Sequence, residues 1–342
     1  MPTITLRPSG LQFQTEDGEA VLIAALRQGY ILPYGCKNGA CGTCKAKILE
    51  GSVDYGAYQK KALTDLEKEM GKALLCQAKP LGDLVIEART VGAAKGIQIK
   101  TLPCRVQKLE RLADDVIVLQ LKLPANEKLE FLAGQYIEFL LRDGSRRSFS
   151  MANPPHASDL LELHVRHVAG GHFTAHVFTK MKERDILRFE GPLGTFFLRE
   201  DSTKPIVFVA SGTGFAPIKA VIEHAFHAGI DRPMTLYWGG RRPKDLYLGA
   251  VPKQWAAEHA NFKYVPVISD ALPEDSWSGR TGFVHRAVME DFRDLSGHQV
   301  YACGVPVMVD AARRDFTEQC RLPEEEFFAD SFTTQADVAG TN

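Results

Sequence analysis

Four of the seven cysteines in this 342-residue chain follow one tight pattern. Cys36, Cys41 and Cys44 are spaced C-x4-C-x2-C on a single glycine-rich loop, and Cys76 lies further along the chain. The interleaved glycines allow a tight backbone path that turns N–H groups toward the sulfur atoms. A chain with this pattern must fold so that Cys76 lies beside the three thiols of the loop. We call these four thiols together the cysteine cage.

The spacing is the signature of plant-type [2Fe–2S] centres, which four thiolates hold. Structural zinc is the alternative, but zinc sites usually pair two close C-x2-C elements, whereas this loop has unequal gaps and one remote ligand. Isolated buried thiols would not fall into this register. We therefore predict that Cys36, Cys41, Cys44 and Cys76 are the ligands of a [2Fe–2S] cluster.

The overall charge and cysteine usage exclude several classes of protein. The 41 basic and 42 acidic side chains give no global field for a polyanion, so we expect no nucleic-acid partner. No apolar run approaches the roughly 18 residues of a membrane helix, and residues 1–10 do not resemble a secretory leader. An odd number of cysteines suits a reducing compartment, so we expect a cytoplasmic protein that does not bind a membrane.

Strand and helix patterns divide the chain. Residues 1–92 read as a small α+β unit, with expected strands at 3–6, 45–48 and 84–86 and a helix at 20–28. The breaker-rich stretch that follows predicts a linker at 93–100. Residues 101–199 are dominated by strands separated by turn residues, as in a small antiparallel barrel. We expect these strands at 116–123, 136–141, 161–166 and 186–190, and one helix at 173–181.

The rhythm changes beyond Pro205 to a short apolar strand followed by a helix, repeated at 206–210, 234–238, 264–268 and 300–303. This alternation predicts a parallel sheet that binds ligands at the carboxyl ends of its strands. We assign residues 200–330 to this unit and 331–342 to a polar tail.

The segment Arg147-Ser148-Phe149-Ser150 resembles the R-x-[YF]-S motif of the ferredoxin–NADP reductase superfamily. The resemblance implies that Arg147 pairs with a flavin phosphate, Phe149 packs on the isoalloxazine and Ser150 reaches its N5 region, where it acts in catalysis. A guanidinium gives a bidentate grip on phosphate, and a flat ring covers a flat ring.

Two further motifs follow in the order that this superfamily has. The run Gly170-Gly171-His172-Phe173-Thr174 pairs glycines with a helix start, whose amides can bind a pyrophosphate, and residues 191–196 resemble its G-P-x-G-x-F turn. Taken alone, the glycines would read as ordinary tight turns. The resemblance implies a flavin site, FAD with FMN as the alternative. Its further cofactor-binding residues are Gly170, Gly171, Phe173 and Thr174, and His164 and Val165 in the run at 164–168.

A glycine loop follows the strand at 206–210 and contains Gly212, Thr213 and Gly214, with Pro217 expected to start the next helix. The loop departs from the usual dinucleotide fingerprint and resembles the G-T-G-x-A-P pattern of the reductase superfamily.

The run at 301–308 resembles the C-G-x-P-x-M element of the same superfamily. The resemblance implies that Cys303 contacts the nicotinamide as a catalytic residue, with Gly304 beside it, although a packed core cysteine is the alternative. Arg241 and its neighbours follow a strand that ends in two glycines, where they could accept the 2′-phosphate of NADPH or belong to a solvated loop. We favour NADH slightly.

The order of these motifs over nearly the whole chain is similar to the reductase components of aromatic-ring dioxygenases, soluble di-iron monooxygenases and CDP-6-deoxyglucoseen reduction. The resemblance implies a multidomain fold: a β-grasp ferredoxin of α+β class, an antiparallel six-stranded flavin-binding β-barrel and an α/β nucleotide-binding domain with a parallel sheet. It also implies a monomer that passes electrons from NADH or NADPH through FAD to the cluster, and then to an oxygenase or dehydrase partner.

Two alternatives stay open. One is a redox sensor or binding protein that uses the cluster and the nucleotide domain as a switch. The other is a self-contained flavin reductase that acts on a small molecule, although little sequence remains to build a large substrate pocket.

Overall fold

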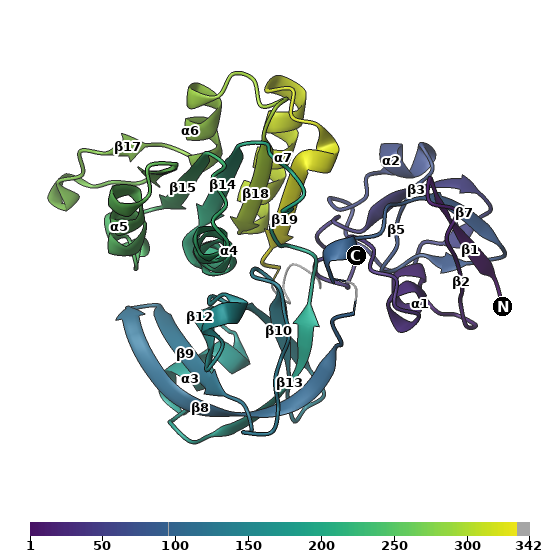
Figure 1. Cartoon of the computed structure of the whole chain (residues 1–342), viewed down its shortest axis with the longest axis horizontal. Helices are drawn as coiled ribbons and strands as arrows, with labels where there is room; N and C mark the ends of the chain where they lie inside the picture. Colours follow the sequence, from purple (N-terminus) through teal and green to yellow (C-terminus); the bar gives the residue numbers. More distant parts are fainter. Residues whose placement is uncertain (95, 334–342) are drawn as a thin grey trace. The chain divides into compact units, whose positions relative to one another are not determined.

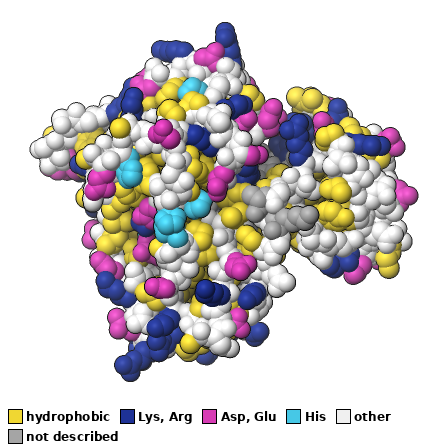
Figure 2. Space-filling model, in the orientation of Figure 1, with side chains coloured by type: hydrophobic (Ala, Val, Ile, Leu, Met, Phe, Trp, Pro, Cys, Tyr) yellow, Lys and Arg dark blue, Asp and Glu magenta, His cyan; other side chains and the backbone are white. Residues whose placement is uncertain are grey.

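The computed structural model describes residues 1–94 and 96–333, and these form two compact units. The small unit comprises Met1–Ile97, together with the described residues from Asp330 onward, and the large unit comprises Gln98–Ala329. Each unit has its own buried apolar core. Figure 2 shows basic and acidic side chains interspersed on the face drawn, in keeping with the balanced charge of the chain.

The small unit contains a mixed sheet with the strand order β2-β1-β7-β3-β5 (Figure 1). The central pair β1 and β7 is parallel, and the other pairs are antiparallel. The predicted strands and helix are all present, and several shorter elements join them. The elements are β1 (Thr3–Arg7), β2 (Gln12–Gln14), α1 (Val21–Arg27), β3 (Lys45–Glu50), β4 (Val53–Asp54), α2 (Asp65–Glu69), β5 (Lys72–Leu74), β6 (Lys79–Pro80) and β7 (Leu84–Glu87).

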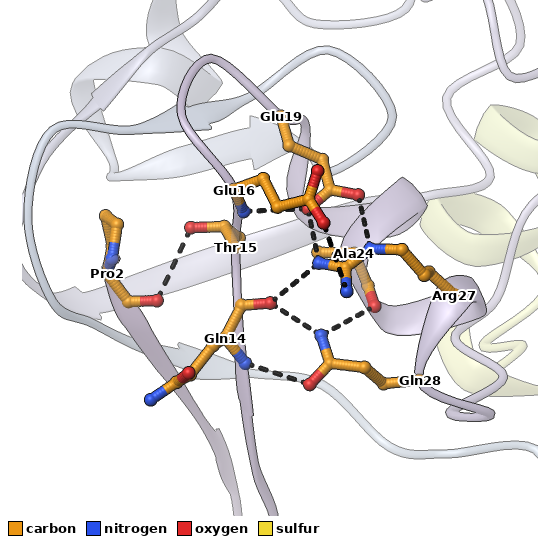
Figure 3. A network of polar contacts seen from close by, with 8 residues as sticks. All are labelled: Pro2, Gln14, Thr15, Glu16, Glu19, Ala24, Arg27 and Gln28. Atoms are coloured by element: carbon orange, nitrogen blue, oxygen red, sulfur yellow. Dashed lines mark hydrogen bonds and ion pairs between the residues drawn. The ribbon is translucent and has the colours of Figure 1, made fainter.

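The end of α1 covers the free edge of strand β2 (Figure 3). The Gln28 side chain accepts from the Gln14 N–H at 3.2 Å and donates to the Gln14 carbonyl at 2.5 Å, as a neighbouring strand would. Arg27 adds a bond to the same carbonyl and is held by Glu19 at 2.8 Å. The backbone groups of Gln14 are thereby satisfied, which makes this end of the edge strand a poor template for pairing with another chain.

The large unit begins with an antiparallel sheet of order β11-β10-β13-β8-β9-β12. An isolated bridge between Met151 and Leu163 links its two end strands, so the sheet closes on an apolar core. Strand β11 was not predicted, because its sequence RRSFS is too charged to show the alternation of a buried strand. The elements are β8 (Lys100–Ala113), β9 (Val116–Lys122), β10 (Tyr136–Leu140), β11 (Arg146–Ser150), β12 (Leu161–Arg166), α3 (His172–Thr179) and β13 (Ile186–Leu193).

A second sheet in the large unit has the order β17-β16-β15-β14-β18-β19. The pairs from β17 to β18 are all parallel, and helices flank the sheet (Figure 1). The predicted alternation of strand and helix is therefore present. The elements are β14 (Ile206–Ser211), α4 (Phe215–His227), β15 (Met234–Gly240), α5 (Ala250–Glu258), β16 (Phe262–Ile268), β17 (Arg280–Thr281), α6 (Val284–Asp291), β18 (Gln299–Gly304), α7 (Pro306–Gln319) and β19 (Phe327–Ser331).

The structure differs from the sequence prediction at two places in this part of the chain, the start of α4 and the C-terminal tail. Pro217 does not start α4, which begins at Phe215 after a short 3-10 turn over Gly212–Gly214. Proline is tolerated there because the first helical N–H groups have no partner within the helix. The predicted tail overlaps β19 at Ser331, and its residues 334–342 lie outside the described part. Among the described helices, none combines the length and apolarity that a bilayer crossing requires.

Candidate functional site

The four predicted cluster ligands lie together in the small unit as two pairs of thiols. Cys36 hydrogen-bonds to Cys41, and Cys44 hydrogen-bonds to Cys76. In each pair the bond lowers the pKa of the accepting sulfur, Cys41 or Cys76, and raises the pKa of its donor. Each pair thus already favours one thiolate.

Backbone groups support the thiolate form. The Cys36 N–H points at the Cys41 sulfur from 3.4 Å, and the Gly39 backbone hydrogen-bonds to the Cys76 sulfur. Gly39 has φ +78°, and a side chain there would meet the Ala57 carbonyl at 2.8 Å. The loop therefore needs glycine at 39 both for its backbone conformation and for its packing.

Two thiol pairs fit a centre with two metal atoms. Within residues 1–94 and 96–333, no three His, Cys, Asp or Glu side chains converge as they would around a single metal ion. The two pairs, together with the N–H groups directed at sulfur, supply the donors and the second shell that a [2Fe–2S] cluster takes.

In the large unit, the predicted flavin residues Phe149 and Phe173 lie together. Their ring centroids are 5.5 Å apart, which joins β11 to the first turn of α3. Ser150, next to Phe149, is buried. Arg147 is half-buried and donates to the Arg146 carbonyl at 2.7 Å, and its charge contributes to lowering the pKa of Asp143. The half-buried Phe149 ring and an arginine two residues before it fit a flat cofactor that carries phosphate.

The turn at Gly170 and Gly171 leads directly into α3. No side chain caps the first turn of this helix, so its N-terminal amides face outward. The Thr174 hydroxyl accepts from the Val168 N–H at 3.1 Å and thereby fixes the turn. A side chain at 171 would meet that hydroxyl at 2.8 Å. A compact glycine turn before uncapped amides is suited to an anion such as a pyrophosphate.

The glycine loop and the Cys303 segment pack directly against each other at the carboxyl edge of the parallel sheet. A side chain at Gly214 would clash with the Cys303 carbonyl and meet the Gly304 nitrogen at 2.7 Å. The Ser211 hydroxyl accepts from the Val305 N–H at 3.1 Å. This edge, with a helix start beside it, is where such sheets bind dinucleotides.

Other predicted nucleotide residues lie at different depths. Cys303 is fully buried, near the end of β18. Thr213 is also buried, whereas Arg241 is exposed on the loop after β15. Val165 lies in the core of the closed sheet, which leaves only its backbone for a cofactor.

Tyr247, the last residue of a run at 241–247 that resembles the R-x-x-x-D-L-Y pattern of related reductases, connects the two sheets of the large unit, a contact that the sequence did not predict. Its hydroxyl lies 2.8 Å from His164 Nδ1 on β12. Its ring stands edge-on to Trp238 at 5.3 Å, and the Trp238 indole donates to the Gly212 carbonyl at 3.0 Å. Arg166, on the same face of β12 as His164, directs its guanidinium at Gly212. The period-2 spacing of His164 and Arg166 was a sequence signal that these two side chains share one face of the strand.

His164 is also linked to a largely buried pair of charged side chains, Glu162 and Lys219. His164 Nε2 lies 3.1 Å from Glu162, which also contacts Lys219 at 3.3 Å on α4. Burial would raise the Glu162 pKa, but the bond from His164 and the charge of Lys219 lower it to about 2. Burial lowers the pKa of His164, so its ring is neutral near pH 7.

Comparison with known families covers most of the chain. Residues 4–81 match the 2Fe-2S iron-sulfur cluster binding domain, residues 103–198 the oxidoreductase FAD-binding domain, and residues 208–314 the oxidoreductase NAD-binding domain. The chain is 41% identical to the CDP-6-deoxy-L-threo-D-glycero-4-hexulose-3-dehydrase reductase of Yersinia pestis, over 96% of this chain and 98% of the relative. The chain belongs to the NAD(P)H-dependent iron–sulfur flavoprotein reductases.

Other members of the reductase family are similar over their full length. The reductase component of phenol 2-monooxygenase from Pseudomonas sp. strain CF600 is 39% identical, over 98% of this chain and 96% of the relative. The crystal structure of the Amycolatopsis cytochrome P450 reductase GcoB matches with a TM-score of 0.77 and 34% identity, covering 98% of this chain and 99% of that one.

The reductase is therefore an oxidoreductase with a [2Fe–2S] cluster and FAD that uses NADH or NADPH. Electrons pass from the nicotinamide through FAD to the cluster, as the sequence predicted. The predicted family, cofactors and reaction class are confirmed, and the multidomain fold is of the ferredoxin-reductase type.

Proposed function

We propose that this reductase supplies electrons to a separate oxygenase or dehydrase component. The proposal rests on the match to two relatives, over at least 96% of both chains in each case. One is named as the reductase of a dehydrase and the other as the reductase component of a monooxygenase. The reduced nicotinamide would give the flavin two electrons and a proton, and the flavin would pass the electrons one at a time to the cluster, which accepts one electron. The chain's own task is then to hold the groups in place and exclude water.

The four cysteines of the cage would hold the cluster, as their paired arrangement supports. Arg147 would bind the flavin phosphate, Phe149 would pack on its ring system, and Ser150 would face its reactive edge. The remaining flavin contacts would come from His164, Val165, Gly170, Gly171, Phe173 and Thr174. The nucleotide would lie on Gly212, Thr213, Gly214, Pro217 and Arg241, with Cys303 and Gly304 near its nicotinamide.

The fold supports a division into three functional parts. We assign the mixed sheet at 1–92 to a β-grasp ferredoxin, the closed antiparallel sheet at 101–199 to a flavin-binding barrel, and the parallel sheet at 200–330 to nucleotide binding, with 93–100 as the linker. One copy of the chain supplies a site for every cofactor, which supports activity as a monomer. All seven cysteines lie in the described residues and none of them forms a disulfide, which supports a cytoplasmic location.

NADH is the coenzyme that the surroundings of Arg242 favour. Its guanidinium is held by Asp275 at 2.6 Å and by Glu274 at 3.2 Å, so its charge is already balanced. The Asp245 carboxylate accepts the backbone N–H of both Arg241 and Arg242 at 2.9 Å. Three carboxylates beside the end of β15 disfavour the added 2′-phosphate of NADPH.

The test begins with purified protein. Iron, acid-labile sulfide and flavin are measured together with the visible spectrum, and NADH-driven reduction of cytochrome c and of a flavin-accepting dye is assayed. We expect two irons and one flavin per chain, and reduction of both acceptors. Flavin bands without cluster absorption, or zinc in place of iron, would reject the proposal. A sensor would bind nucleotide without sustained turnover.

A further inference from the structure

We propose that Tyr247 is a positioning residue that acts through His164 to hold the nucleotide-binding glycine loop in register with the flavin-binding barrel. The inference rests on the proposed function, because it concerns the geometry in which the nicotinamide meets the flavin. It assigns a role to a tyrosine that is not one of the residues proposed to react, Ser150 and Cys303.

The protonation of the two partners follows from the network. The ionised Glu162 carboxylate can only accept a hydrogen bond, so His164 Nε2 carries the proton and donates to it. His164 Nδ1 is left as an acceptor, and the Tyr247 hydroxyl donates to it over 2.8 Å. Burial raises the pKa of Tyr247 well above its ordinary value, so the hydroxyl keeps its proton. The direction of the bond is thus fixed.

The bond between Tyr247 and His164 links two parts of the fold that lie 83 residues apart in the sequence. His164 lies in the middle of β12, whose neighbouring residue Val165 is in the barrel core. Tyr247 follows the loop after β15 and packs edge-on against Trp238. Trp238 in turn stacks on Phe215 at 3.9 Å, at the first residue of α4.

The same contacts reach the glycine loop itself. The Trp238 indole bonds to the Gly212 carbonyl, so the loop is linked to β12 through Trp238 and Tyr247. Arg166, two residues after His164, touches Gly212 from the barrel side. A movement of Tyr247 would therefore change where the loop lies relative to β12. Reaction rates fall steeply when reacting groups are displaced by even 1 Å.

The test uses the holoenzyme with two matched substitutions. Tyr247→Phe removes the hydroxyl bonded to His164. Tyr264→Phe removes a buried hydroxyl that makes no hydrogen bond within the described residues, and so serves as the control. Flavin reduction by NADH is followed by stopped flow, together with the nicotinamide–flavin charge-transfer absorbance and the dissociation constant of NAD⁺.

We expect Tyr247→Phe to lower the flavin-reduction rate at saturating NADH by about tenfold, the effect of one lost hydrogen bond. The charge-transfer absorbance should weaken, and the NAD⁺ dissociation constant should change less than about twofold. Hydrogen exchange should quicken in the segment around 247 and in the glycine loop. Tyr264→Phe should match the wild type. A Tyr247→Phe protein that is less stable but has wild-type rate and absorbance would overturn the proposal.

A double-mutant cycle of Tyr247 and His164 tests the proposal even if Tyr247→Phe weakens flavin binding. His164→Leu and the double variant are reconstituted with flavin and measured in the same way. If Tyr247 acts through His164, adding Tyr247→Phe to His164→Leu has no further effect on the rate. Additive losses would refute the linkage. A wild-type protein that NADH does not reduce would instead refute the proposed function.

Discussion

Gly214 and Cys303 approach each other so closely that the Cys303 carbonyl occupies the place a side chain at 214 would take. Gly214 lies in the glycine loop after β14 and Cys303 lies near the end of β18, and these two strands pair in parallel. Gly214 has φ −58°, which any residue adopts, so the requirement for glycine here is one of space alone.

Gly214→Ala should therefore separate the glycine loop from β18. We expect a loss of about 1–3 kcal/mol in the free energy of unfolding, typical of overpacking, and at least a tenfold weaker affinity for NADH. Chemical denaturation and nucleotide titration measure the two effects. Gly297→Ala is the control, because that glycine is exposed and a side chain there meets nothing within 4 Å. Equal behaviour of the two variants would contradict the steric reading.

Cys76→Ser should uncouple the two halves of the reaction. Without one of its four thiol ligands the cluster should not be retained. NADH-driven reduction of cytochrome c should then fall to background, while reduction of a dye that accepts electrons from the flavin continues. Cys320→Ala, outside the cage, should retain both activities. Equal loss of both activities in Cys76→Ser would tell against the cluster as the outlet for electrons.

Release of Arg242 should improve the use of NADPH. In the double variant Glu274→Gln and Asp275→Asn, the guanidinium loses both carboxylate partners. We expect kcat/KM for NADPH to rise about fivefold relative to that for NADH, the effect of about 1 kcal/mol from an exposed charge. Glu290→Gln, which opens an ion pair at Arg280, is the control. No change in the coenzyme ratio would show that the 2′-position lies elsewhere.

The Glu162 network should make stability depend on pH. The folded-state pKa of Glu162 is about 2, below its ordinary value of 4.5, so its contribution is full above about pH 4.5 and is lost as pH falls toward 2. Glu162→Gln should lower the free energy of unfolding by roughly 3 kcal/mol near pH 6, with the difference shrinking as the pH falls. Urea titrations followed by near-UV circular dichroism at pH 3 to 6 measure this difference. A difference in the free energy of unfolding that stays constant with pH would refute this role of Glu162. Glu258→Gln on α5 is the control for the loss of a surface charge.

The sequence was informative where the pattern is local. The cysteine spacing and the glycine motifs lie on single segments, and β12 is apolar at every second residue, so its predicted bounds of 161–166 match the structure. Strand β11 was not predicted because arginines and serines occupy most of its positions. Its pairing with β10 shows that it is a strand.

Contacts between distant residues could not be predicted in this way. Tyr247 lies 83 residues from His164, and Asp275 lies 33 residues from Arg242. Such pairs depend on how the sheets and loops meet, and a single sequence contains no periodic signal for this. The start of α4 was misplaced for a related reason, because Pro217 marks the first turn of a helix without marking its first residue.

A chain folded as two compact units, each with a separate core, can fail in one unit and keep the other working. When iron is scarce, newly made protein would still oxidise its coenzyme but would lack the cluster through which electrons leave. Dissolved oxygen would then be the nearest acceptor for those electrons. The supply of iron–sulfur clusters would then decide whether the electrons leave through the cluster or reduce oxygen.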